Sequence, residues 1–167
     1  HENSSAASDV YKRQIHNYIR QSGDAAYMAD GGWEVVLGVA RFWAQRVNWS
    51  EAKQAWVMLG VTGPNEYENN VNNNWYTNRL AAWCLQYAGE ALDWMKAHAP
   101  DALAEQNARW SFDESAERPH WESVSNGMFY PSLEGTRVFL QQDGYMDKEQ
   151  RMAADLDDAK RPINQHW

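Results

Sequence analysis

Cysteine, positive charge and long apolar runs are all scarce in this sequence, and each scarcity excludes a class of protein. The 167 residues include one cysteine, Cys84, so the chain can form neither an internal disulfide nor a pair of thiolates for a metal. Cys84 follows Trp83 in an apolar helical pattern, and we interpret it as a small buried hydrophobic residue. No stretch approaches the roughly 20 apolar residues that cross a bilayer, so we expect no membrane partner.

Positive charge is in deficit because 15 Lys and Arg residues stand against 23 Asp and Glu residues, which gives a net charge of −8. An acidic surface disfavours nucleic acid and anionic membranes as partners. The five histidines show none of the spacings that bind a metal, so we expect no metal site. Residues 1–14 lack the apolar segment of a secretory signal, and we expect a cytoplasmic protein.

Tryptophan, by contrast, is abundant, with ten residues in the chain. The face of a Trp ring stacks well on the apolar C–H face of a sugar, and its N–H can reach a hydroxyl group. Most of the ten are nevertheless expected in the core of a helical protein. The composition therefore suggests a carbohydrate ligand without establishing one.

The interior of the chain has the apolar spacing of amphipathic helices. We expect helices over residues 15–21, 25–47, 78–98, within 101–110 and over 119–126. Thr77 is the expected N-cap of the third of these, and Pro119 suits the first position of the last. Residues 1–14 match no element, and we interpret them as a linker-like segment of non-native origin.

Two stretches lack helical spacing. Residues 57–77 contain glycines and a run of asparagines, and we expect a long loop with a short extended lead-in. Residues 127–146 are expected to form turns with short strands at 128–130 and 138–140, ending at Asp143-Gly144. A loop of about twenty residues in a compact domain is usually functional or disordered, and the aromatic residues of this one favour order. Long helices joined by such loops suggest a helical barrel with a site at one end.

The first of these loops carries the residues most suited to chemistry. Gly63-Pro64 predicts a tight turn that fixes the backbone shortly before Glu66. A carboxyl group held between Pro64 and Tyr67 would be partly desolvated, and desolvation raises a carboxyl pKa toward the range that a general acid needs. A second interpretation stays open on these residues alone, namely a structural loop with Glu66 and Glu68 as surface acids.

Residues 60–78, GVTGPNEYENNVNNNWYTN, resemble the signature of glycoside hydrolase family 65 in its maltose phosphorylase branch. Residues 139–149, FLQQDGYMDKE, resemble the family's later loop, and residues 161–165, RPINQ, resemble the start of its next segment. The similarity covers residues 15–167. The branch is favoured by Asn65 and by the run Glu68-Asn69-Asn70. In kojibiose and trehalose relatives the corresponding stretch tends to differ, with Asp at the position of Asn65.

The resemblance implies a mainly α fold, with residues 15–167 forming part of an (α/α)6 barrel with long loops and a few short strands. It also implies inverting phosphorolysis of an α-linked glucose disaccharide, with maltose favoured, by a homodimeric enzyme without a cofactor. Glu66 would be the catalytic residue that protonates the departing glycosidic oxygen. Inorganic phosphate, the co-substrate, would attack from the opposite face and give β-glucose 1-phosphate. Phosphate is already an anionic nucleophile, so the second carboxylate of an inverting hydrolase is not required.

Other residues near the signature are weaker candidates. Glu68 competes as the acid, because in an extended loop it would point the same way as Glu66. The resemblance favours Glu66 and leaves Glu68 a supporting role. Tyr67 and Gln142 are candidate substrate-binding residues. Asp143 either shapes the site or only forms a turn with Gly144.

Several alternatives stay open. The chain could come from a family 65 hydrolase such as an acid trehalase, from a non-catalytic carbohydrate-binding helical module, or from a structural protein without a ligand. By the resemblance, the glucose-binding Lys-Gln pair and the phosphate-binding residues lie downstream of this chain. We therefore expect an incomplete fragment that is inactive alone and poorly soluble, because apolar helix faces would be exposed. The linkage of the substrate is not fixed by these residues.

Overall fold

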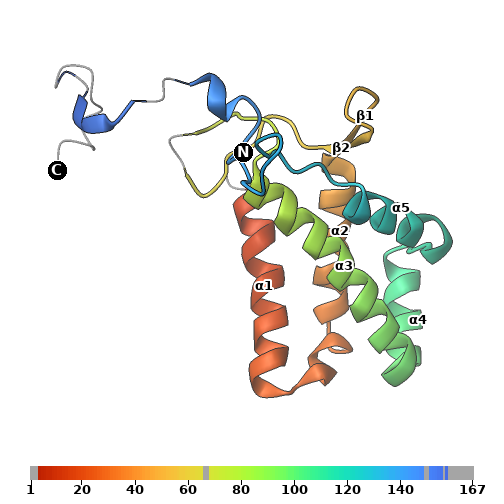
Figure 1. The fold of residues 1–167 in the computed structure, drawn as a ribbon. Helices are drawn as coiled ribbons and strands as arrows, with labels where there is room; N and C mark the ends of the chain where they lie inside the picture. Colours follow the sequence, from red (N-terminus) through yellow and green to blue (C-terminus); the bar gives the residue numbers. More distant parts are fainter. Residues whose placement is uncertain (1–3, 66–67, 149–150, 156, 158–167) are drawn as a thin grey trace.

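The computed structural model describes residues 4–65, 68–148, 151–155 and 157, and it is mainly helical, as the sequence predicts. Its elements are α1 (Ser4–Ser22), the 3-10 turn η1 (Ala25–Met28), α2 (Gly32–Arg46), β1 (Asn48–Ser50), β2 (Ala55–Val57), α3 (Trp75–His98), α4 (Pro100–Arg109), α5 (Glu114–Asn126) and the 3-10 turns η2 (Tyr145–Asp147) and η3 (Ala153–Asp155). Figure 1 shows the α-helices packed together, with the strands and the long loops gathered where α3 begins.

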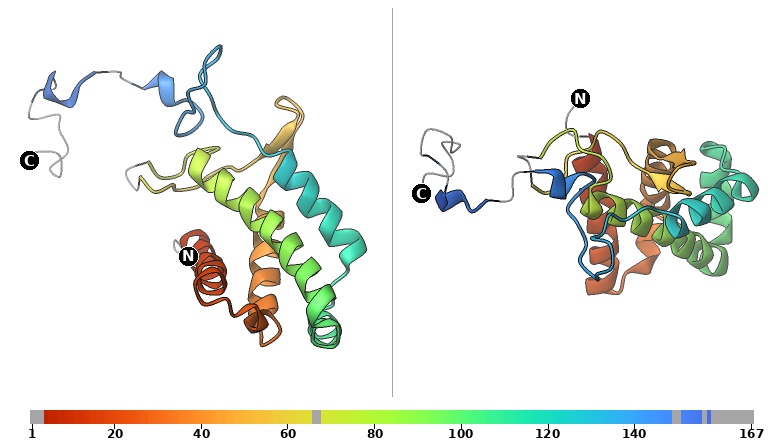
Figure 2. Two further views of the ribbon diagram at one scale, coloured as in Figure 1. Left: turned by 60° about the horizontal axis from the view of Figure 1, so that its bottom comes forward. Right: turned by 45° about the horizontal axis from the view of Figure 1, so that its top comes forward.

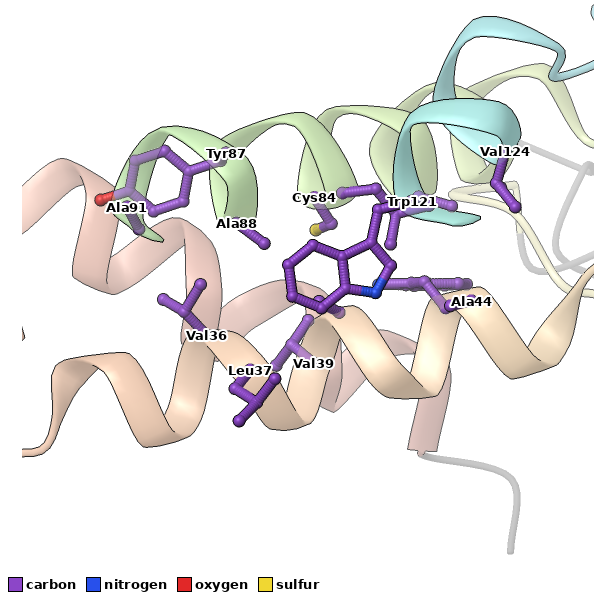
Figure 3. Close-up of a cluster of buried hydrophobic side chains, with 14 of the residues drawn as sticks. Val36, Leu37, Val39, Ala44, Cys84, Tyr87, Ala88, Ala91, Trp121 and Val124 are labelled. Carbon is purple, nitrogen blue, oxygen red and sulfur yellow. The ribbon is translucent and has the colours of Figure 1, made fainter. Parts of the chain in front are cut away.

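The core lies between α2, α3 and α5, and α1 packs on the outer side of α2. Trp33, Trp43 and Trp121 are among the largest fully buried side chains. In Figure 3 the Trp121 indole lies between α2 and α3, beside Cys84, which is buried as predicted. Burial of one large apolar side chain contributes about 1.5–3 kcal/mol, so these tryptophans are structural. Among the described residues, no helix is long and apolar enough to cross a bilayer.

Helix α1 begins earlier than the sequence predicts. It ends at Ser22, as expected, but it starts at Ser4, so residues 4–14 are helical and the expectation that they match no element is wrong. This segment contains Ala, Lys, Arg and Gln, which favour helix, and extending an existing helix costs far less than starting one. The non-native origin of residues 1–14 stays a prediction.

Gly31 divides the predicted helix over residues 25–47. Its φ of 96° lies in the left-handed region, which glycine adopts without strain, and it separates η1 from α2. The predicted N-cap of α3 is also wrong. Asn74 caps this helix, because its Oδ1 accepts from the Thr77 N–H at 3.1 Å, and Thr77 lies within the helix.

Helix α4 falls where the sequence predicts, whereas α5 starts five residues early, at Glu114. Asp113 caps α5, and its Oδ1 accepts from the Ser115 N–H at 2.9 Å. Pro119 therefore lies inside the helix and not at its first position. A good cap overrides the preference of proline for the first turn.

The two strands form an antiparallel hairpin in which Asn48 is opposite Val57. The strands predicted at 128–130 and 138–140 are reduced to single bridges, Trp56 with Met128 and Ser132 with Phe139. The first bridge still joins β2 to the segment after α5. Both long loops consequently lie at the same end of the helices, as the two views in Figure 2 show.

Candidate active site

The loop between β2 and α3 is closed at its base by main-chain hydrogen bonds. The Val61 N–H donates to the Val71 carbonyl at 2.8 Å, and the Val71 N–H donates to the Val61 carbonyl at 2.9 Å. Residues 62–70 lie between these bonds. They include Glu66 and Tyr67, which fall outside the described residues. The structure thus fixes the frame of this loop, and the roles of Glu66 and Tyr67 stay predictions.

The asparagines that follow satisfy main-chain groups. The pairs are Asn72 Oδ1 with the Gly60 N–H and Asn73 Oδ1 with the Met58 N–H, each at 3.0 Å. Asn70 and Asn73 have φ values of 54° and 51°, a conformation that asparagine tolerates better than most residues. Loop structure therefore accounts for the presence of Asn72 and Asn73.

A cavity of about 320 Å³ opens beside Pro64. Trp75 and Tyr76 line it from the start of α3, and Phe139 and Gln141 line it from the second long loop. The ring centroids of Trp75 and Phe139 lie 5.0 Å apart. Aromatic faces next to amide groups form the kind of surface that holds a sugar ring.

The second long loop is attached to the first on two sides. The Trp75 N–H donates to the Gln141 carbonyl at 2.9 Å, and the Asp143 N–H donates to the Asn72 carbonyl at 3.0 Å. These bonds join residues about seventy positions apart in the sequence, so no local spacing predicts them. They join the two loops into one surface at the N-terminal end of α3.

Asp143 does more than form a turn with Gly144. Its Oδ2 accepts from Asn73 Nδ2 at 2.6 Å and lies 3.6 Å from Lys53 Nζ. Asn73 is itself 1% exposed. Asp143 therefore links the two loops and the β1–β2 turn, which supports the prediction that it shapes the site.

Glu68 faces the second loop and is held as a carboxylate. Its Oε2 accepts from Gln142 Nε2 at 2.8 Å, and its Oε1 forms an ion pair with Lys148. The contacts with Lys148 and then Gln142 hold the pKa of Glu68 below its usual value, although partial burial opposes them. A carboxyl group with a lowered pKa is a poor proton donor near neutral pH, so Glu68 does not suit the role of general acid.

Gln142 is 1% exposed, and both ends of its amide are occupied. Its Nε2 donates to Glu68, and its Oε1 accepts from Gln141 Nε2 at 2.8 Å. The structure places it against the first loop, and its contact with substrate stays a prediction. The sequence singled out neither Lys148 nor Asn73 for a role. Both lie in the runs that carry the family resemblance, which is the signal that could have found them.

The described part of the chain holds no cluster of three or more His, Cys, Asp or Glu side chains that could bind a metal ion. The described part of the site consists instead of amides, aromatic rings and the carboxylates of Glu68 and Asp143 with their lysine partners. Residues 3–167 match the glycosyl hydrolase family 65 central catalytic domain. The chain belongs to this family.

Two curated relatives show which family 65 enzymes the chain is similar to. The maltose phosphorylase of Bacillus subtilis is 41% identical over 153 residues, which cover 92% of this chain and 19% of that protein. A kojibiose phosphorylase of Halothermothrix orenii is 31% identical over 135 residues, which cover 81% of this chain and 17% of that protein. The chain spans about a fifth of the length of the curated relatives it matches.

One solved structure of the family superposes closely on the chain. It is described as a putative kojibiose phosphorylase from human microbiome, with a TM-score of 0.76 and 27% identity over 92% of this chain and 21% of that one. The predicted fold class is confirmed, and the helices of this family 65 chain are part of an (α/α)6 barrel.

Proposed function

We propose that this chain is part of an inverting phosphorylase that cleaves an α-linked glucose disaccharide with inorganic phosphate as co-substrate. The observation that carries the proposal is the commitment of Glu68 to Lys148 and Gln142. The signature contains two acids, and one of them is held ionised. Glu66 is then left as the proton donor, and Glu68, whose two oxygens are bound by Lys148 and Gln142, is not free to activate water as the second carboxylate of an inverting hydrolase does.

In this mechanism the carboxyl group of Glu66 gives its proton to the glycosidic oxygen. The bond from C1 to that oxygen breaks, and its electron pair stays on the oxygen of the departing glucose. A phosphate oxygen bonds to C1 from the opposite face, which inverts the configuration and gives β-glucose 1-phosphate. The proton that hydrogen phosphate brings restores the Glu66 carboxyl group. The reaction requires no further cofactor.

Maltose is the favoured substrate in this proposal. The support is the 41% identity to a maltose phosphorylase, together with Asn65 in the signature. The cavity lined by Trp75 and Phe139 offers an aromatic surface for a sugar ring beside the loop that carries Glu66. A homodimeric assembly, which the family resemblance implies, and a cytoplasmic location complete the proposal.

The test uses the full-length protein that contains this chain. It is incubated with maltose, with and without phosphate, and the products are identified by NMR. The proposal predicts phosphate-dependent formation of glucose and of the β anomer of glucose 1-phosphate. Release of glucose at the same rate without phosphate would assign the protein to the hydrolases. Phosphorolysis of kojibiose, nigerose or trehalose in place of maltose would correct the substrate alone.

A further inference from the structure

A three-residue polar link joins the two loops of the candidate site. Glu68 belongs to the first loop and Gln142 to the second, and Lys148 directly follows η2 at the end of the second loop. Each oxygen of the Glu68 carboxylate has its own partner, since Gln142 Nε2 donates to Oε2 at 2.8 Å and Lys148 pairs with Oε1. Two partners on two oxygens fix the orientation of a carboxylate as well as its position.

The link is anchored at both ends. Gln142 is 1% exposed and accepts from Gln141 Nε2 at 2.8 Å, so its amide cannot rotate without losing a bond. At the other end the Glu68 N–H donates to the Asn65 carbonyl at 3.0 Å. Glu68 is therefore held through its main chain as well as through its side chain, and the partners of its side chain lie outside the first loop.

The link adds little to folding. The side chains of Glu68 and Lys148 are 26% and 38% exposed, and water screens an ion pair of that kind. A contact that contributes little stability but fixes Glu68 against Gln142 and Lys148 is suited to positioning. The lowered pKa of Glu68 agrees with this role, because the carboxylate stays ionised at the pH where such enzymes are assayed.

We propose that Glu68, held by Gln142 and Lys148, is a positioning residue that sets where the loop at residues 61–71 presents the proton donor. The inference rests on the function proposed above and assigns a role to the second acid of the signature. Glu68 acts through the loop and does not contact the reacting atoms. A misplacement of about 1 Å in a catalytic group lowers a rate by about 100-fold, so a small loss of order is measurable.

The experiment compares variants of the full-length protein on two substrates. One is maltose, and the other is α-glucosyl fluoride, whose leaving group departs without a proton. Glu68→Ala is expected to lower kcat on maltose by about 10–100-fold with KM changed by less than about threefold. The loss on α-glucosyl fluoride is expected to be at least about fivefold smaller, because proton donation no longer limits that reaction.

Lys148→Met and the near-isosteric Glu68→Gln keep the variants folded and test the same link. Each is expected to lower kcat on maltose. Both changes break the ion pair between Glu68 and Lys148, so the kcat of the double variant is expected to be no lower than that of the more impaired single variant. Glu105→Gln removes an acid of an exposed pair on α4 and is the matched control. It is expected to leave kcat unchanged.

Amide hydrogen exchange separates the inference from the proposed function. Glu68→Ala is expected to speed exchange of the Val61 and Val71 N–H groups. If the wild type forms no sugar phosphate, the proposed function fails. The exchange rates of Val61 and Val71 then still show whether Glu68 orders the loop. Unchanged exchange, kcat within about twofold of wild type, or equal losses on maltose and α-glucosyl fluoride would each overturn the inference.

Discussion

Gly63 lies against the side chain of Asn74, which caps α3, and the space between them does not admit a methyl group. A Cβ at this position would clash with Asn74 Nδ2 and would lie 2.6 Å from Asn74 Oδ1. That amide caps α3, because its Oδ1 accepts from the N–H and the hydroxyl of Thr77, each at 3.1 Å. The glycine of the signature is therefore a packing requirement that couples the loop to the helix.

Gly63→Ala is expected to displace Asn74 and to lower the free energy of unfolding by about 1–3 kcal/mol, through the lost cap and local overpacking. Urea denaturation of the variant and the wild type measures the change. Gly38→Ala is the matched control, because no atom lies within 4 Å of a Cβ at this position in α2. It should raise stability by about 0.5–1 kcal/mol, as alanine favours helix. Equal stabilities for Gly63→Ala and the wild type would contradict the packing argument.

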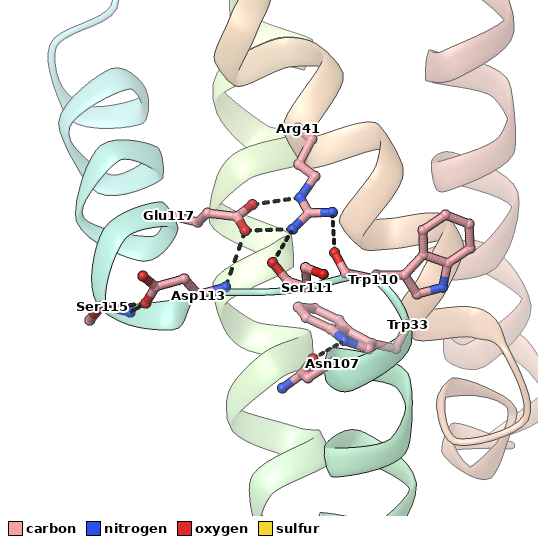
Figure 4. Close-up of polar contacts among 8 residues, drawn as sticks. All are labelled: Trp33, Arg41, Asn107, Trp110, Ser111, Asp113, Ser115 and Glu117. Atoms are coloured by element: carbon pink, nitrogen blue, oxygen red, sulfur yellow. Dashed lines mark hydrogen bonds and ion pairs between the residues drawn. The ribbon is translucent and has the colours of Figure 1, made fainter.

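At the scale of elements, Arg41 joins α2 to the turn between α4 and α5 (Figure 4). Its Nε and one terminal nitrogen donate to the two oxygens of Glu117 at 2.7 and 2.6 Å. The guanidinium also donates to the Trp110 carbonyl at 2.9 Å and to the Ser111 carbonyl at 3.3 Å. The contact with Glu117 raises the pKa of Arg41, so the pair stays charged. The Arg41 side chain thus donates hydrogen bonds to the two main-chain carbonyls that directly follow α4.

Arg41→Met is expected to lower the free energy of unfolding by about 1–3 kcal/mol, because two carbonyls and one carboxylate lose their donor together. Arg109→Met is the matched control. Arg109 pairs with two acids, Glu34 and Glu105, but its side chain is 57% exposed against 28% for Arg41, and its loss should cost about 0.5 kcal/mol or less. Chemical denaturation of both variants gives the comparison. A similar cost at the two positions would refute the special role of Arg41.

The interiors of the helices were predictable from apolar spacing, but several ends were not. Helix α4 and the last residue of α3 fall where the pattern places them. The starts of α3 and α5 were missed because the side chains of Asn74 and Asp113 capture N–H groups ahead of the apolar pattern. The spacing of apolar residues contains no information about such N-cap hydrogen bonds. The start of α1 was missed for a different reason, since helix propensity alone extends it.

Part of the candidate site was also predictable. The signature, the turn at Gly63 and the second loop follow from residue types and from the family resemblance. The link from Glu68 to Gln142 joins residues 74 positions apart, and it depends on how the two loops meet at the N-terminal end of α3. No periodicity within either loop contains that information. The resemblance favoured Glu66 over Glu68 as the acid, and the position of Lys148 adds a physical reason, because it lowers the pKa of Glu68.

At the scale of the whole molecule, apolar side chains are exposed over several surfaces. Tyr18 and Val35 are 47% and 40% exposed and line a cavity of about 440 Å³ on α1 and α2. Val138 and Phe139, in the second loop, are 54% and 61% exposed. Exposed apolar surface of this kind favours association in water.

The isolated chain is expected to self-associate and to show no phosphorolysis of maltose. Size-exclusion chromatography with light scattering measures the mass of the species, and a sugar-phosphate assay measures the activity. Val35→Lys should reduce the association, because a charge would then lie on the exposed face of α2. A monodisperse monomer with phosphorolytic activity would show that these residues alone form a complete site.

The assignment of Glu66 as the proton donor is tested most directly by Glu66→Gln in the full-length protein, assayed with phosphate on maltose and on α-glucosyl fluoride. The mechanism predicts that kcat on maltose falls by about 100–10,000-fold, whereas turnover of α-glucosyl fluoride stays within about tenfold of the wild type. Glu68→Gln, measured alongside, should lose far less on maltose. Maltose phosphorolysis at the wild-type rate by Glu66→Gln would contradict the assignment.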